Sequence, residues 1–281
     1  MRKFKFNKKY IPAFILAAAC LVVAILCVMK AVDGIKYNEE LSQSSIIDIK
    51  QITLTADGGN GDEIPKNTSF AIDDLRSKGF TSIKIDARLT ADKKWVALAD
   101  EDISSVTNGF GNVSEYKYYQ LMNYNLKNTP ASSPAVIELV TDVAQYAFSN
   151  SFTPIIYIHN YSKSAIRTLI EEVSALSPQV FYIASSDTRI IEYANKVSAA
   201  QLCFYYTDKI TEESIDFCKN NASVTLCFNA KNNSRKDVEM LLSEEIPYAC
   251  YGAETLREIE KFYKLGIRHF INDSVEIGVS Q

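Results

Sequence analysis

From residue 46 to the C-terminus, short apolar runs alternate with stretches in which apolar residues recur at helical spacing. Two clear helical stretches are 164–176 and 234–243. The apolar runs are rich in β-branched and aromatic residues, which is typical of strands. Nine runs are predicted as strands: 51–56, 81–86, 95–99, 153–158, 180–184, 201–206, 223–228, 246–251 and 268–271.

Strands and helices that alternate without a break in composition predict an α/β fold, a single (β/α)8 TIM barrel. Nine strands are one too many for eight positions. The link between Asp86 and Trp95 is too short for a helical crossover, so these two runs are not neighbouring parallel strands. A longer, tyrosine-rich excursion follows, from residue 108 to 151, and we expect its tyrosines (116–124) to pack a lid.

One apolar run stands apart, because residues 11–29 form nineteen positions without a charge, enough to span a membrane as a helix. The basic residues before it, five in number, predict that the N-terminus stays in the cytoplasm. We therefore expect a basic cytoplasmic tail (1–10), a transmembrane anchor (11–30), a linker (31–45) and an extracytoplasmic barrel (46–281). The predicted location is the cell membrane, single-pass. Cleavage as a signal peptide and a lipoprotein at Cys20 are the alternatives.

The charge balance bears on the partners of the exported part. The first thirty residues hold six of the 30 basic residues and no acidic ones, which leaves 24 basic against 34 acidic residues. This excess of negative charge argues against nucleic acid as a partner. The four cysteines beyond the anchor show no zinc-binding spacing, so we expect buried free thiols.

A series of short motifs lies between residues 53 and 111. They read Thr-Ala-Asp-Gly (55–58), Pro-Lys-Asn-Thr (65–68), Ile-Lys-Ile-Asp (83–86), Leu-Ala-Asp (98–100) and Thr-Asn-Gly (107–109). In order and approximate spacing they resemble the glycerophosphodiester phosphodiesterase family, where the same stretches read His-Arg-Gly, Pro-Glu-Asn-Thr, Glu-Leu-Asp, His-Asp and Thr-x-Asn-Gly. Residues 265–273 resemble the family's closing strand, so the resemblance covers about 52–274. It implies a PLC-like phosphodiesterase TIM barrel.

The resemblance also implies a mechanism that this chain does not support. In the family, two histidines act as acid and base, and glutamates and an aspartate hold a divalent cation. Here the histidine positions are Ala56 and Ala99, and the phosphate-gripping arginine is Asp57. The glutamate ligands are Lys66 and Lys84, Tyr157 and His159 stand where the family has Glu-x-Lys, and only Asp86 keeps a ligand type. We therefore expect a degenerate member, a pseudoenzyme with no catalytic residues and no metal or other cofactor.

Three hypotheses describe what the altered site does. In the first, Lys66 and Lys84 form a closed salt-bridge network with Asp57, Asp86 and Asp100. In the second, a pocket binds a ligand through Lys66, Lys84, Asp86, Asp57, Tyr157 and His159. In the third, a rebuilt catalytic site uses Asp86, Asp100 and His159, with Ca²⁺ or Mg²⁺.

The function predicted from these observations is a binding or interaction domain at the cell envelope. Its partner would be a glycerol-phosphate or glycan-like ligand or an envelope protein, and the membrane is reached through the N-terminal helix. The alternative is an active phosphoric diester hydrolase of lipid metabolism with a non-standard site.

The sequence also gives expectations for five residues outside the predicted chemistry. Asn67 is expected to cap the helix that follows it, and Asn108-Gly109 to form a turn that demands positive φ. Trp95 is expected inside the barrel, and His269 at the barrel's bottom face without a role.

Overall fold

The computed structural model describes residues 51–59, 64–129, 134–197 and 202–273. The chain divides into two units, Met1–Asp48 and Ile49–Gln281, and the described residues all belong to the second. Within those residues no helix is long and apolar enough to span a bilayer. The predicted tail, anchor and linker lie outside them, so the membrane topology stays a prediction.

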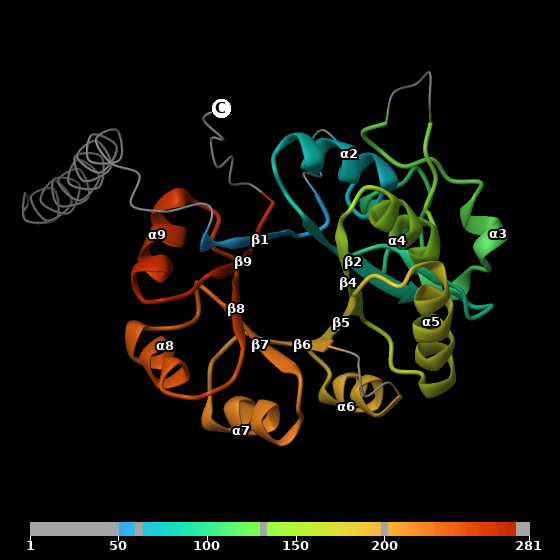
Figure 1. The fold of residues 1–281 in the computed structure, drawn as a ribbon. Helices are drawn as coiled ribbons and strands as arrows, with labels where there is room; N and C mark the ends of the chain where they lie inside the picture. Colours follow the sequence, from blue (N-terminus) through green and yellow to red (C-terminus); the bar gives the residue numbers. More distant parts are fainter. Residues whose placement is uncertain (1–50, 60–63, 130–133, 198–201, 274–281) are drawn as a thin grey trace, which may run out of the picture. The chain divides into compact units, whose positions relative to one another are not determined.

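Eight parallel strands close into a barrel, as predicted, and form the ring seen end-on in Figure 1. The ring closes where β1, the first strand of the described chain, pairs with β9, the last, and β1 also pairs with β2. The strands are β1 (Thr53–Ala56), β2 (Ser82–Leu89), β4 (Thr153–Ile158), β5 (Tyr182–Ser185), β6 (Leu202–Thr207), β7 (Val224–Asn229), β8 (Tyr248–Tyr251) and β9 (His269–Ile271).

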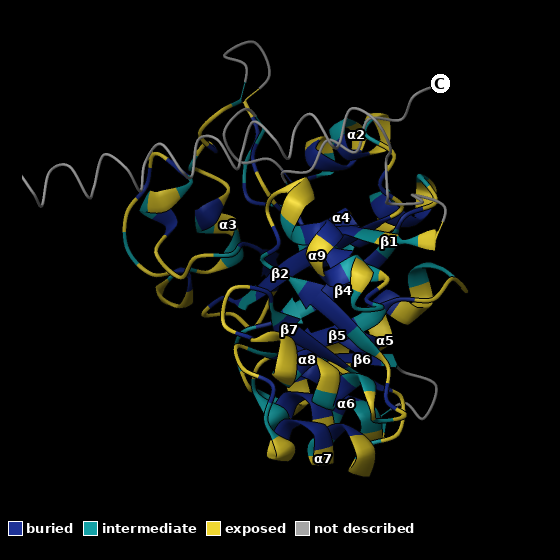
Figure 2. Ribbon diagram, turned by 90° about the vertical axis from the view of Figure 1, so that its left-hand side faces the viewer, coloured by how far each residue is buried: buried dark blue, intermediate teal, exposed yellow. Residues whose placement is uncertain are grey.

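Amphipathic helices surround the ring and bury one apolar face each on the strands. The last of these helices is an example. Thr255 is its N-cap, with a side chain that accepts from the Glu258 amide, and its apolar residues Ile259 and Phe262 are buried. Figure 2 shows the strands largely buried and the outer helix faces exposed. The helices are α2 (Ser69–Ser77), α4 (Val140–Ser149), α5 (Lys163–Leu176), α6 (Thr188–Val197), α7 (Glu212–Asn220), α8 (Arg235–Leu242) and α9 (Leu256–Lys264).

The ninth predicted strand is the extra one. β3 (Trp95–Ala97) runs antiparallel to β2 outside the ring, which confirms that these two runs are not parallel neighbours. The prediction that Trp95 packs inside the barrel was wrong. The Trp95 side chain is buried outside the barrel. Its indole N–H donates to the carbonyl of Ala165 in α5 at 2.9 Å.

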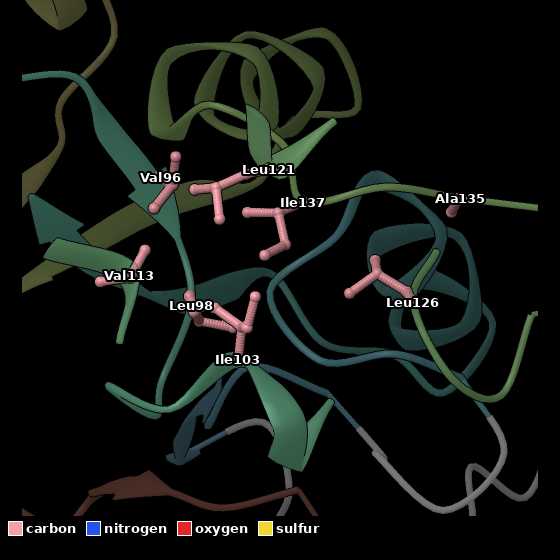
Figure 3. Close-up of a cluster of buried hydrophobic side chains, with 8 residues drawn as sticks. All are labelled: Val96, Leu98, Ile103, Val113, Leu121, Leu126, Ala135 and Ile137. Carbon is pink, nitrogen blue, oxygen red and sulfur yellow. The ribbon is translucent and has the colours of Figure 1, made fainter. Parts of the chain in front are cut away.

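An insertion between β3 and α4 builds a small core of its own, drawn in Figure 3. Three of the four tyrosines (Tyr116, Tyr118 and Tyr124) pack against this core, whereas Tyr119 is exposed. The insertion also contains α3 (Tyr118–Leu121) and the 3₁₀ helices η3 (Ile103–Ser105) and η4 (Val113–Glu115). The tyrosines therefore hold the insertion together rather than cover the site.

The predicted positive-φ turn at Asn108-Gly109 was wrong, because neither residue has a positive φ. Gly109 is required for another reason. A Cβ atom there would lie 2.7 Å from the Tyr124 ring and 2.9 Å from Ile103, so a larger residue would force these side chains to shift.

His269 lies where it was expected, at the N-terminal ends of the strands. It lines a cavity of about 500 Å³ with hydroxyl side chains that include Thr55 and Ser82. Its Nε2 lies 2.9 Å from the Thr55 hydroxyl, and the Phe204 ring packs edge-on against it.

Candidate functional site

A cavity of about 350 Å³ opens at the C-terminal ends of the strands, the end at which TIM barrels carry their working residues. The structure brings together five of the residues that the sequence singled out, from β1, β2 and β4. Four further side chains complete the lining. The lining residues are Asp57, Lys84, Asp86, Tyr157, His159, Ser186, Tyr206, Asp208 and Tyr251.

One of the lining residues, Lys84, is an ion-paired lysine. The Lys84 ammonium lies 2.5 Å from Asp57 Oδ1 and 3.4 Å from Asp86 Oδ1, and 5.1 Å from the centre of the Tyr157 ring. Burial lowers the pKa of Lys84, but the attraction of Asp86 and Asp57 outweighs burial and raises it above its usual value. The lysine therefore carries a fixed positive charge between two carboxylates. This part of the predicted salt-bridge network is confirmed.

Asp86 is the most heavily bonded group of the site and is almost fully buried. Its amide N–H donates to Asn67 Oδ1 at 2.7 Å, and Asn67 Nδ2 donates to Asp86 Oδ2 at 3.3 Å. Burial raises the pKa of Asp86, but Lys84 and the hydrogen bond from His159 outweigh it, so the pKa falls to about 2. The carboxylate is ionised at any physiological pH.

Asn67 has a different role from the predicted one. The N-cap of α2 is Thr68, whose hydroxyl accepts from the Ala71 amide at 3.3 Å. Asn67 precedes the cap at φ 60°, a left-handed conformation that asparagine tolerates better than most residues. This turn directs its amide at Asp86, so Asn67 fixes the carboxylate rather than the helix.

His159 is held at both ring nitrogens. Its Nε2 lies 2.9 Å from Asp86 Oδ1, and its Nδ1 lies 3.4 Å from an Arg88 nitrogen. A guanidinium only donates, so Nδ1 accepts and Nε2–H donates to Asp86. Arg88 itself is fixed by the Ala99 carbonyl at 2.8 Å. With its lone pair directed at Arg88, His159 has no free nitrogen to act as a base toward a molecule in the cavity.

Two expected members of the site lie elsewhere. The predicted partners of Lys66 were wrong: its ammonium pairs with Asp273 at 2.5 Å, and Lys66 does not line the cavity. Asp100 is exposed and joins neither the cavity nor an ion pair among the described residues. Ala56, Ala99 and Asp57 stand where the motif resemblance places the family's two histidines and arginine. Neither alanine side chain can carry a proton.

Sequence reasoning missed the residues of the later strands. Tyr206, Asp208 and Tyr251 line the cavity from the C-terminal ends of β6 and β8. The Tyr206 ring lies 5.0 Å from the Tyr157 ring and 5.2 Å from the Tyr251 ring, so the three form one aromatic wall. The signal was their position at the ends of predicted strands. Tyr251 ends a run (246–251) that resembles a strand of the family, but no family motif marks Tyr206 or Asp208.

The residues present do not fit a divalent cation. A lysine ammonium stands between Asp57 and Asp86, where it repels any metal ion that the two carboxylates would hold. Nowhere in the described part of the chain do three His, Cys, Asp or Glu side chains converge as ligands.

A closed eight-stranded parallel barrel with helices around it and a polar cavity at the C-terminal strand ends places the protein in the class of (β/α)8 barrels. The model of the glycerophosphoryl diester phosphodiesterase family matches residues 59–277. The chain belongs to this family. Among curated proteins, none matches the chain by sequence.

Solved structures agree on the fold. A phosphodiesterase from Oleispira antarctica, in complex with the product sn-glycerol-3-phosphate, superposes with a TM-score of 0.74 at 14% identity, covering 80% of this chain and 94% of that one. A glycerophosphoryl diester phosphodiesterase from Parabacteroides distasonis gives 0.67 at 19% identity, covering 84% and 87%. A family protein from Silicibacter pomeroyi gives 0.68 at 10% identity, covering 79% and 90%. At these identities the likeness establishes the barrel alone.

Proposed function

We propose that this protein is a membrane-anchored, exported member of the family that does not hydrolyse glycerophosphodiesters, and that its barrel acts as a binding domain at the cell envelope. One observation carries the proposal. The Lys84 ammonium, 2.5 Å from Asp57 and 3.4 Å from Asp86, takes the place that the family resemblance gives to a metal-binding glutamate. Metal-assisted attack on a phosphodiester lacks its cation at such a site.

The residues at the proton-transfer positions also favour a barrel that does not hydrolyse phosphodiesters. Ala56 and Ala99 replace the two histidines that the resemblance implies, and alanine neither accepts nor donates a proton. His159, the remaining candidate, has its ring nitrogens directed at Asp86 and Arg88.

Anchoring is supported by the sequence alone. The uncharged run 11–29 follows five basic residues, a pattern that keeps the N-terminus in the cytoplasm and places the following domain outside.

The alternative is an active phosphoric diester hydrolase that uses an unfamiliar set of residues. Membership of a family of phosphodiesterases favours it. Against it, Asp100 lies exposed and outside the cavity, and Asp86 is neutralised by Lys84.

The test is turnover by the full-length chain in mild detergent. Release from glycerophosphodiesters and from a chromogenic phosphodiester is measured with Mg²⁺, Ca²⁺ or Mn²⁺, beside an Asp86→Ala variant. We expect no metal-dependent product from protein that circular dichroism shows to be folded. Metal-dependent turnover that Asp86→Ala abolishes would establish the hydrolase and overturn the proposal.

A further inference from the structure

We propose that the cavity at the C-terminal end of the barrel binds a neutral polyhydroxy compound, a sugar or polyol, in preference to a phosphorylated one, with Tyr206 as a ligand-contacting residue. The inference rests on the proposed binding function and names the class of ligand. It separates the glycan-like ligand from the glycerol-phosphate ligand, which the sequence left as alternatives.

The first argument is charge. Three carboxylates line the cavity (Asp57, Asp86 and Asp208) against one ammonium, that of Lys84. The ammonium is already shared between Asp57 and Asp86, and Lys66 lies outside the lining, paired with Asp273. A phosphate dianion would therefore enter against net repulsion, whereas an uncharged ligand meets none.

The second argument is an unsatisfied hydroxyl. Tyr206 is 7% exposed and lines the cavity, and its hydroxyl has no hydrogen-bond partner among the described residues. Burial raises the pKa of Tyr206 well above its usual value, so the group stays protonated. An unpaired buried hydroxyl is destabilising, and such groups normally have a hydrogen-bond partner in the functional state. The hydroxyl itself is enclosed in this structure, so a ligand reaches it only when neighbouring side chains of the cavity wall shift; a ligand hydroxyl then supplies the partner, because it both donates and accepts.

The third argument is the shape of the wall. The rings of Tyr157 and Tyr206 meet at 89°, and those of Tyr206 and Tyr251 at 40°, which forms a curved aromatic surface. Aromatic faces pack against the C–H face of a sugar or polyol while polar groups at the edge bind its hydroxyls. Asp208 stands at that edge, where the Tyr251 hydroxyl donates to its Oδ1 at 3.0 Å. A carboxylate accepts from adjacent hydroxyl groups with its two oxygens.

The size of the cavity, about 350 Å³, is at the lower end of the range of roughly 300–1,000 Å³ typical of small-molecule sites. It suits a single ring or a short polyol.

The experiment compares matched neutral and phosphorylated pairs on the full-length chain. The protein is held in a detergent without a sugar headgroup, because a glycoside detergent would compete for the cavity. Binding is measured by saturation-transfer NMR and calorimetry at constant ionic strength. The pairs are glycerol and sn-glycerol 3-phosphate, myo-inositol and myo-inositol 1-phosphate, and glucose and glucose 6-phosphate. We expect at least one neutral compound to bind with a millimolar or tighter Kd, and its phosphorylated partner to bind about tenfold more weakly or worse.

Tyr206→Phe removes one hydroxyl and keeps the aromatic wall, so it should weaken binding of the neutral compound about five- to tenfold. Tyr205→Phe is the matched control. It lies on the same strand with its ring against Phe217, 4.8 Å away, and it does not line the cavity. It should leave binding unchanged.

Three results would overturn the inference: tighter binding of the phosphorylated member in every pair, no binding of any neutral compound at 50 mM, or equal losses in Tyr206→Phe and Tyr205→Phe. Maltoheptaose beside glucose distinguishes a glycan chain from a free sugar, and either preference supports the inference. Failure here is distinct from failure of the proposed function. Phosphodiester turnover would overturn that proposal, whereas a preference for phosphate without turnover overturns only this one.

Discussion

Lys84 shows how one side chain changes the chemistry of an inherited site. Two carboxylates that would otherwise repel each other, Asp57 and Asp86, are held close by a single ammonium. Asp86 is nearly inaccessible, so its charge needs that partner: leaving a buried charge unpaired costs about 3–5 kcal/mol.

This explanation predicts a metal response in Lys84→Glu. The substitution places a third carboxylate beside Asp57 and Asp86. We expect it to destabilise the apo-protein by several kcal/mol and to create a site that Ca²⁺ or Mg²⁺ stabilises by about 3 kcal/mol at a hundred times Kd. Thermal unfolding with and without the cation measures both effects.

Lys94→Glu is the control for that variant, because it makes the same charge change at an exposed position. The same metal response in both variants would mean that general electrostatics, and not the cavity, is responsible.

His269 provides a second test at a single residue, through pH. Burial lowers the pKa of its imidazole from 6.5 to about 4. Between these values the unfolded chain binds a proton that the folded protein excludes, so acidification favours unfolding. The free energy of unfolding should therefore fall as the pH drops from about 6.5 to about 4.

His269→Gln should keep a polar group near Thr55 but remove this titration. Between pH 7 and pH 4 we expect the free energy of unfolding to fall by up to about 3 kcal/mol more in the wild type than in the variant, as measured by denaturant unfolding. The carboxyl of Asp273 titrates in the same pH range. Burial, and to a smaller extent the charge of Asp57, raise its pKa to about 6, so acidification through this range increases its contribution to the free energy of unfolding. Asp273 is present in both proteins, so its contribution cancels when wild type and variant are compared. Parallel pH profiles would contradict the assignment.

At the level of elements, the insertion after β3 folds around its own apolar cluster beside the barrel. Its packing is tight at Gly109, where a Cβ would meet the Tyr124 ring at 2.7 Å and Ile103 at 2.9 Å. The cluster therefore depends on side-chain fit at this point, and not on an unusual backbone angle.

Gly109→Ala should cost about 1–3 kcal/mol through overpacking. In a Tyr124→Ala background the same substitution should cost much less, because most of the obstruction is gone; a double-mutant cycle measures the difference. Equal costs in both backgrounds would indicate backbone strain instead of crowding.

For the whole molecule, the basic N-terminal residues should set the orientation of the chain. Changing Lys3, Lys5, Lys8 and Lys9 to glutamate leaves Arg2 as the one basic side chain before the apolar run and makes the net charge of residues 1–10 negative. We expect protease added outside intact spheroplasts to digest the barrel of the wild type and to spare a substantial fraction of the variant. Digestion of neither protein, with both intact in the membrane fraction, would contradict an extracytoplasmic barrel.

Much of the fold could be predicted from the chain because its signals are local. Alternating strand and helix patterns gave the barrel, and the short link before Trp95 identified the surplus strand. The resemblance to the family's motifs pointed to Asp57, Lys84 and Asp86. The detailed roles were less predictable: Asn67 looked like a helix cap by residue type, yet its left-handed backbone turns it toward Asp86.

What only the closed barrel decided is which strand ends meet. Lys66 reaches Asp273, 207 residues away, because β1 and β9 are neighbours in the ring, and nothing near Lys66 in the chain specifies that partner. Tyr206 and Tyr251 join Tyr157 in one wall for the same reason. The periodicity of the sequence indicates which residues are buried and which strand end they occupy. Ion pairs and an unsatisfied hydroxyl depend instead on distances between residues far apart in sequence. Closure of the sheet into a barrel sets those distances.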